Sequence, residues 1–153
     1  MTTISSDFKH DVFLGYFNNE GTANSFVDHL YQALVNKGIN TFIKQNGEMR
    51  TCIEEIEYSR MSMVVLCENY GSSTSCLDEL VKIVEYIDNK SRNVTAIFYK
   101  VEPSDIRKQK NSYKAAMDEH EKIYGRDSEK IGRWRYALTR VCDLSGVHCK
   151  DTL

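Results

Sequence analysis

Glu79 is a carboxylate whose position in the sequence could support chemistry. It follows a serine-rich segment, Ser72 to Ser75, lies next to Asp78, and precedes an apolar helical stripe. A carboxylate fixed at such a place can stabilise positive charge that develops on a substrate. The alternative is structural, because acidic residues are common in the first turn of a helix, and Ser75 would then serve as the N-cap. Both interpretations stay open at this level.

The elements that must position Glu79 are short apolar runs alternating with amphipathic stretches. The patterns predict strands at 12–14, 41–43, 61–66 and 94–99, and helices at 22–37, 49–58, from about 75 onward, and at 129–144. We expect Gly38 at the end of the first helix, Pro103 in a loop or first helical turn, and Gly146 closing the last helix. A fifth strand is expected near either Ile123-Tyr124 or Val147-His148.

The nearly all-apolar run 61–66 indicates a central strand that is buried on both faces. Strands that alternate with helices predict a parallel, doubly wound α/β sheet. We expect one domain over residues 10–148, with a flexible segment at 1–9 and a tail at 149–153.

A ligand of such a sheet binds beyond the carboxyl ends of the strands, where the strand order reverses. For the flavodoxin-like order 2-1-3-4-5, this crevice lies between strands one and three, and the loops 15–21 and 67–75 face it. The candidate residues at the crevice are Tyr16, Asn18, Asn19, Glu20, Glu68, Tyr70, Ser72, Ser73 and Glu79.

Several familiar sites are excluded. The sequence contains no G-x-G-x-x-G, no G-x-x-x-x-G-K-[ST] and no G-x-S-x-G. A phospho-receiver aspartate is missing, because the end of the third strand reads Leu66-Cys67-Glu68. A flavin-binding loop has weak support, since segment 18–22 offers a single glycine.

Composition limits the partners and the compartment. The 153 residues carry a formal net charge of −2, which favours neither nucleic acid nor an anionic membrane. No apolar run approaches the length of a membrane span, and the N-terminus lacks a signal-peptide core. The five cysteines are odd in number and form no C-x-x-C pair, which favours free thiols over disulfides or a metal site. We expect a cytoplasmic or nucleocytoplasmic protein.

A series of segments resembles one known family. They are, in order, Asp11-Val12-Phe13-Leu14, HLYQAL (29–34), KGINTFI (37–43), SRMSMVVLCENYGSS (59–73), CLDELVKI (76–83), IFYKVEPSDIRKQ (97–109) and WRYALTRVCDLSG (134–146). Together they resemble the TIR (Toll/interleukin receptor) domain of plant disease-resistance proteins over about residues 10–148. The resemblance implies a five-stranded parallel flavodoxin-like sheet.

Two linked functions are implied by this resemblance. TIR domains associate with other TIR domains to signal in plant innate immunity, and many plant members cleave NAD and release nicotinamide. The family's catalytic glutamate falls on Glu79, which implies NAD⁺ as the candidate substrate and no permanently bound cofactor. Breaking the C–N glycosidic bond leaves an oxocarbenium-like centre that a carboxylate can stabilise. The candidate dinucleotide-binding residues are Tyr16, Asn18, Tyr70, Ser72 and Ser75.

Three departures from the family pattern affect the expected catalysis. The family's SFRGEDTR reads GYFNNEGTA, with Phe17 or Asn18 near the first expected arginine and Ala23 at the second. Ser75 replaces an aromatic residue, and the loop from Lys44 to Thr51 is several residues short. Because a carboxylate without substrate-holding groups loses orientation, we expect weak or absent NAD cleavage.

Self-association is therefore the favoured function. The family's Ser-His pair on the first helix reads Asp28-His29, which would meet its counterpart and the last helix across a symmetric face. Asp28 could pair with Arg133 or Arg135, or it could repel its own copy. His29 would make association sensitive to pH near neutrality. The alternative for His29 is a half-exposed place beside the core stripe.

Overall fold

The computed structural model describes residues 8–18, 22–44, 51–144 and 146–149. The strands are β1 (His10–Gly15), β2 (Thr41–Ile43), β3 (Ser59–Leu66), β4 (Asn93–Tyr99) and β5 (Gly146–Cys149). The helices are α1 (Thr22–Asn36), α2 (Ile53–Glu57), a 3-10 turn η1 (Tyr70–Ser72), α3 (Thr74–Lys90), α4 (Pro103–Arg107), α5 (Ser112–Tyr124) and α6 (Glu129–Val141). All strand pairs are parallel, in the order β2-β1-β3-β4-β5. The predicted fold class is confirmed.

Strand β3 lies at the centre of the sheet, as its apolar run predicted. It pairs with β1 on one side and with β4 on the other, for example through Leu14 with Met63 and Val64 with Ala96. Its last three residues, Val64 to Leu66, are at most 1% exposed. The turn beyond β3 therefore opens at the carboxyl edge of the sheet, next to the end of β1.

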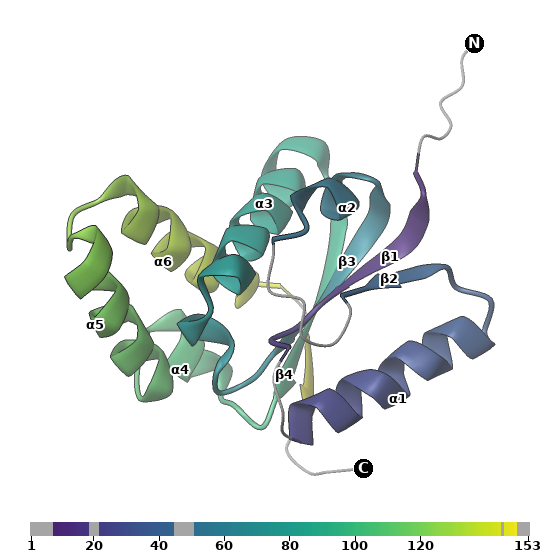
Figure 1. The fold of residues 1–153 in the computed structure, drawn as a ribbon, viewed down its shortest axis with the longest axis horizontal. Helices are drawn as coiled ribbons and strands as arrows, with labels where there is room; N and C mark the ends of the chain where they lie inside the picture. Colours follow the sequence, from purple (N-terminus) through teal and green to yellow (C-terminus); the bar gives the residue numbers. More distant parts are fainter. Residues whose placement is uncertain (1–7, 19–21, 45–50, 145, 150–153) are drawn as a thin grey trace.

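Helices cover both faces of the sheet. Figure 1 shows α1 on one side and α2 and α3 on the other, as right-handed crossovers between parallel strands require. On the α1 side, Phe26 contacts Tyr99 of β4 with ring centroids 4.9 Å apart. On the other side α6 packs along α3, and the buried Trp134 donates its Nε1–H to Asp78 Oδ1 at 2.9 Å. Each fully buried large apolar side chain contributes roughly 1.5–3 kcal/mol.

The start of α3 differs from the prediction. Ser73, not Ser75, is the N-cap, because its backbone is extended and its Oγ accepts the Cys76 N–H at 3.2 Å. Thr74 and Ser75 are already helical. Glu79 therefore lies in the second turn, where the helix dipole has largely faded. Its position is not explained as that of a first-turn acid.

The end of the chain corrects two further expectations. Helix α6 ends at Val141 rather than at 144, and Gly146 does not close it but begins β5. The fifth strand thus corresponds to the second of the two predicted places, and it extends through Cys149. A Cβ on Gly146 would lie 2.7 Å from the Ala96 carbonyl oxygen of β4, so glycine permits the close approach of the two strands. The first predicted place, Ile123-Tyr124, ends helix α5, which the pattern did not predict.

Other boundaries agree more closely. Gly38 (φ 80°) follows α1, and Pro103 is the first residue of α4. Helix α2 covers the second half of the range predicted at 49–58, and the expected start at Met49 lies outside the described residues. Within the described part of the chain, no helix is long and apolar enough to span a membrane.

Candidate functional site

Glu79 is a buried carboxylate held by two groups from other parts of the chain. It projects from α3 and is 2% exposed. Its Oε2 atom lies 2.8 Å from Lys44 Nζ, which follows β2, and accepts the backbone N–H of Cys52, just before α2, at 2.9 Å. The Lys44 side chain is itself only 5% exposed. The carboxylate is thus fixed inside the protein rather than presented to solvent.

Two opposing influences act on the Glu79 carboxyl group. Burial raises the pKa, because removal from water penalises the charged form. The Lys44 ammonium and the Cys52 N–H oppose this by stabilising the carboxylate. A buried charge needs such compensation to be tolerated. The structure therefore makes Lys44 the cation that keeps Glu79 acceptable in the interior.

A small hollow lies beside this ion pair. Its volume is about 10 Å³, which is room for roughly one water molecule. Pockets for ligands of dinucleotide size are far larger, commonly about 300–1,000 Å³. The lining residues are Tyr16, Phe17, Asn18, Lys44, Ser73, Ser75 and Cys76. Lys44 both lines the hollow and pairs with Glu79, whereas Glu79 is not part of the lining.

Three of the five predicted dinucleotide-binding residues meet at this hollow, and two do not. Tyr16, Asn18 and Ser75 line it. Tyr70 is 1% exposed, and its hydroxyl donates to the Cys76 carbonyl at 3.1 Å. Ser72 is exposed, and its Oγ donates to the Asn69 carbonyl at 2.7 Å.

Two of the crevice candidates, Asn19 and Glu20, lie outside the described residues. Lys44, Phe17 and Cys76 also line the hollow, and they were not among the residues predicted from the sequence to bind a ligand. Lys44 could have been found from topology, because β2 lies next to β1 and its carboxyl end therefore approaches the same crevice.

The two titratable neighbours of Lys44 in the lining stay uncharged. Burial first, and then the charge of the nearby Asp28, raises the pKa of Tyr16 to about 12. Its hydroxyl donates to the Lys44 carbonyl at 3.1 Å. Burial also raises the pKa of Cys76 to about 12, and the thiol donates to the Tyr16 carbonyl at 3.6 Å. A neutral thiol is a poor nucleophile, so cysteine catalysis is not supported here.

Larger hollows exist away from Glu79. One of about 540 Å³ lies between α3 and α6, and another of about 620 Å³ lies beside the starts of α4 and α5. Neither is lined by Glu79, Lys44 or Tyr16. Among the residues that the structure describes, no group of three or more His, Cys, Asp or Glu side chains could hold a metal ion.

The residues predicted to mediate association differ in their exposure and in their contacts within the same molecule. Asp28 and His29 are exposed on α1. On α6, Arg133 is exposed and contacts Glu129 Oε1 one turn earlier at 2.8 Å. Arg135 is bound within its own molecule, by the Glu121 carboxylate and by the Gln109 Oε1 atom at 3.2 Å.

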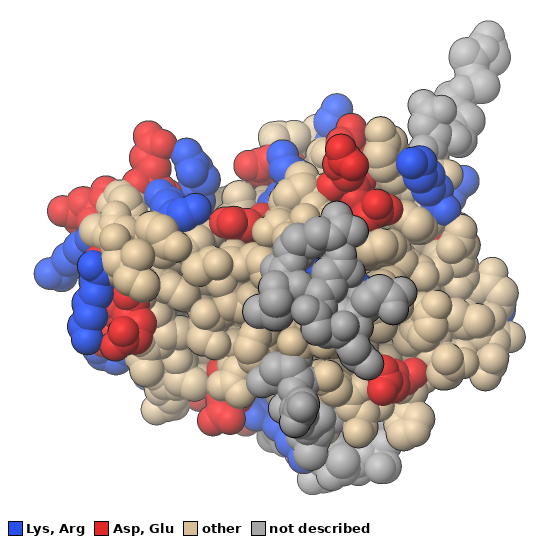
Figure 2. Space-filling view, in the orientation of Figure 1, with Lys and Arg blue, Asp and Glu red and all other residues tan. Residues whose placement is uncertain are grey.

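Side chains of both charge signs are interspersed on the face shown in Figure 2, in keeping with the net charge of −2. No single-sign area on this face indicates a polyanionic partner.

The fold and the position of the carboxylate beyond the central strand place the protein in a class. This class is the parallel flavodoxin-like domains that have a site where the order of the strands reverses. The family model described as TIR domain matches residues 9–153, so the chain belongs to the TIR family. TMV resistance protein N of Nicotiana glutinosa is 43% identical over 95% of this chain. Disease resistance protein RPV1 of Vitis rotundifolia is 44% identical over 93%. The chain spans 13% and 10% of these two relatives.

A solved structure of TIR domains is similar over nearly the whole chain. The TIR domains in the structure of the activated Roq1 resistosome, which directly recognises the pathogen effector XopQ, match with a TM-score of 0.82 at 39% identity. The match covers 94% of this chain and 90% of that one. The predicted TIR resemblance is confirmed.

Proposed function

We propose that this chain is a signalling module of plant innate immunity that acts by association with other TIR domains. The observation that carries the proposal is its similarity, over 94% of its length, to TIR domains solved within a resistosome assembly. Relatives of 36% to 44% identity bear the names of plant resistance proteins, which supports the same role. The four cysteines whose side chains the structure describes are free thiols, which fits a reducing, cytoplasmic or nucleocytoplasmic location.

The exposed charges on α1 and α6 supply a specific contact for this association. Figure 1 shows that α1 and α6 lie on different sides of the sheet, so Asp28 can meet Arg133 only in a second copy. Arg133 is the better partner than Arg135, because its ion pair with Glu129 is exposed to solvent, whereas Arg135 is held by Glu121 and Gln109 in a partly buried place. An exposed pair of this kind contributes roughly 0–1 kcal/mol, enough to tune a weak association.

Sedimentation of charge-reversal variants tests this contact. We expect the wild-type average mass to rise with concentration, Asp28→Lys or Arg133→Glu to weaken association by a few-fold, and the double reversal to restore it. Lys114→Glu on α5, which removes an exposed pair with Asp118, is the matched control and should leave association unchanged. A wild-type mass that stays monomeric at every concentration would contradict the proposed function.

NAD hydrolysis by Glu79 is the second candidate. It is favoured by a buried carboxylate in the helix beyond β3, at the switch of strand order. The small hollow weighs against activity in the conformation described. The test is nicotinamide release from NAD⁺ by wild type and by Glu79→Gln, which removes the charge and keeps the shape. Equal release from both proteins would leave the association role alone.

A further inference from the structure

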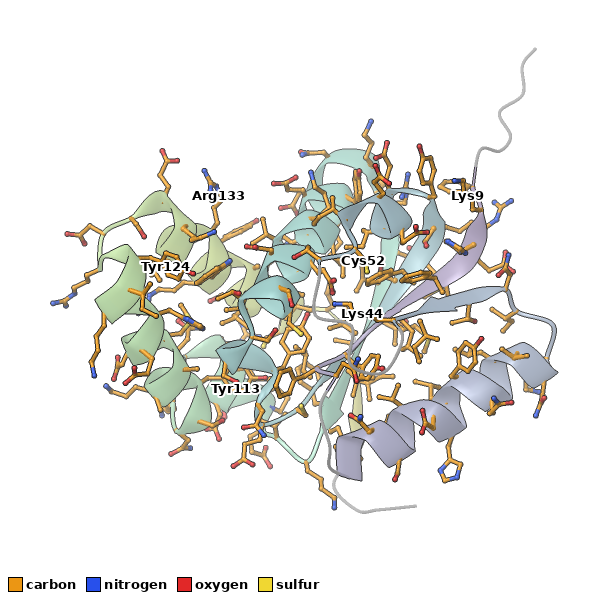
Figure 3. All side chains as sticks on the ribbon, in the orientation of Figure 1. Lys9, Lys44, Cys52, Tyr113, Tyr124 and Arg133 are labelled. Carbon is orange, nitrogen blue, oxygen red and sulfur yellow. The ribbon has the colours of Figure 1, made fainter. Side chains whose placement is uncertain are left out.

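The ion pair of Lys44 and Glu79 has the geometry of an occupied site. The Nζ–Oε2 distance of 2.8 Å is that of a charge-assisted hydrogen bond. Figure 3 shows Lys44 and Cys52 close together near the middle of the molecule, in agreement with their shared contact to the Glu79 carboxylate. A positive group thus already lies against the carboxylate.

Lys44 is the only cation among the described residues that line the hollow. The other lining residues are hydroxyl, amide, thiol and aromatic side chains, and none is a carboxylate. Glu79 is therefore the anionic group that these contacts place against the Lys44 ammonium. The Lys44 backbone is fixed separately, through its carbonyl and the Tyr16 hydroxyl. The ammonium is therefore carried by a four-carbon stem with several rotatable bonds, on a backbone that has its own contact.

We propose that the Lys44 ammonium is an internal occupant of the Glu79 site, held where the cationic centre of a bound ligand would lie. The ligand class follows from charge. When Lys44 withdraws, the buried carboxylate is left uncompensated, and a cationic ligand restores the balance whereas a neutral one does not. The site therefore selects a positively charged nucleoside, such as a pyridinium riboside, over its neutral reduced form.

This inference rests on the second candidate function, in which Glu79 faces a pyridinium ribosyl group. It adds a residue to that function, and a preference in binding that is separate from the chemical need for a pyridinium leaving group. Lys44 acts as a specificity-determining residue, because it competes with the ligand for the carboxylate. It is not a catalytic residue in this proposal, since it leaves before the ligand arrives.

The first test measures access to Glu79. Lys44→Met keeps the aliphatic stem and removes the charge. We expect Glu79 to react with a water-soluble carbodiimide and glycine ethyl ester about tenfold more in this variant, as quantified by peptide mass spectrometry. Lys82→Met, which removes a partly exposed lysine paired with Glu85, is the matched control and should leave the labelling of Glu79 unchanged. Equal labelling of Glu79 in wild type and Lys44→Met overturns the proposal.

The second test measures selectivity with a defined probe. Nicotinamide riboside is a cation, and its reduced form is neutral. We expect Lys44→Met to bind the cation about tenfold more tightly than wild type, with no matching gain for the neutral form. Equal gains for both probes, or none, would show that Lys44 does not compete for the carboxylate. Lys44→Gln, which keeps a hydrogen-bond donor, replaces Lys44→Met if the methionine variant does not fold.

Failure of the inference and failure of the hydrolase function give different results. Greater labelling of Glu79 and tighter cation binding in Lys44→Met, without nicotinamide release, support the internal occupant and remove the hydrolase. Nicotinamide release that depends on Glu79 but is the same in wild type and Lys44→Met supports the hydrolase and overturns the internal occupant.

Discussion

The buried ion pair makes the stability of the protein depend on two side chains jointly. Removing one partner of a buried pair commonly costs roughly 3–5 kcal/mol, whereas replacing both with apolar groups is often neutral or stabilising. We therefore expect Lys44→Met to lower the free energy of unfolding by that amount. Lys44→Met/Glu79→Met should recover most of the loss. Urea unfolding of the single and double variants measures this, and costs that simply add would contradict the coupling.

The pH dependence of stability follows from the direction of the Glu79 shift. Burial raises the folded-state pKa above the ordinary carboxyl value of 4.5, so the folded protein binds more protons than the unfolded chain between these two values. The stabilisation by the protonated form is complete below the ordinary value and is lost as the pH rises through the raised pKa. Urea midpoints of wild type should fall relative to Glu79→Gln over that window.

The same titration separates the role of Lys44. Because its ammonium opposes the rise in the pKa of Glu79, Lys44→Met should extend the loss of stability to higher pH. Parallel curves for wild type and Glu79→Gln at every pH would show that Glu79 has an ordinary pKa in the folded state.

Among single residues, the Glu79 carboxylate could be predicted from the sequence, but its ion pair with Lys44 could not. Glu79 could be found from its motif and from the position of its helix beyond the central strand. The contact with Lys44 joins two elements, and periodicity within one element carries no information about it. The same holds for Tyr70, whose place in a loop suggested access to ligand, whereas its ring fills the core.

At the scale of elements, the first turn of α3 depends on its cap. Ser73 caps the helix, so Ser73→Ala should lower the free energy of unfolding by about 1 kcal/mol, within a range of roughly 0.5–2. Ser75→Ala is the comparison, since Ser75 is inside the helix and touches the cap only through the 3.2 Å contact of its Oγ with Ser73 Oγ, and it should change stability by less than about 0.5 kcal/mol. Thermal unfolding of both variants checks this, and a larger loss for Ser75→Ala would restore the cap predicted from sequence.

Two glycines should respond in opposite directions to alanine. A Cβ on Gly71 would lie 2.7 Å from the ring of Tyr113, a fully buried side chain whose hydroxyl donates to the Cys67 carbonyl. We expect Gly71→Ala to cost roughly 1–3 kcal/mol through overpacking. Gly132 lies inside α6 with open space around a Cβ, so Gly132→Ala should gain about 0.5–1 kcal/mol. Melting temperatures that move in the same direction would contradict this account.

Most elements could be predicted because their apolar periodicity is strong. Helix α5 could not, because its buried residues are few and include a histidine. Tyr113, Met117 and His120 have helical spacing, but charged side chains surround them. His120 is accommodated by a hydrogen bond between its Nε2 and the Gly71 carbonyl oxygen and by an edge contact with Trp134. Only tertiary structure supplies these partners.

For the whole molecule, association should depend on the surface of α1 that carries His29, whose side chain is exposed. We expect His29→Glu to weaken association measured by sedimentation, because it places a second negative charge beside Asp28 on this surface. The same mass for wild type and His29→Glu at every concentration would exclude His29 from the contact.

The two edge strands of the sheet limit how copies of this domain can associate. The strands at its flanks are short, with three residues in β2 and four in β5. A long exposed edge would offer a row of free amide and carbonyl groups for a strand of another chain, which is the route to fibrous aggregates. These described flanks offer little such template. Clusters of this domain should therefore form through helix surfaces rather than by strand addition, and should dissolve on dilution.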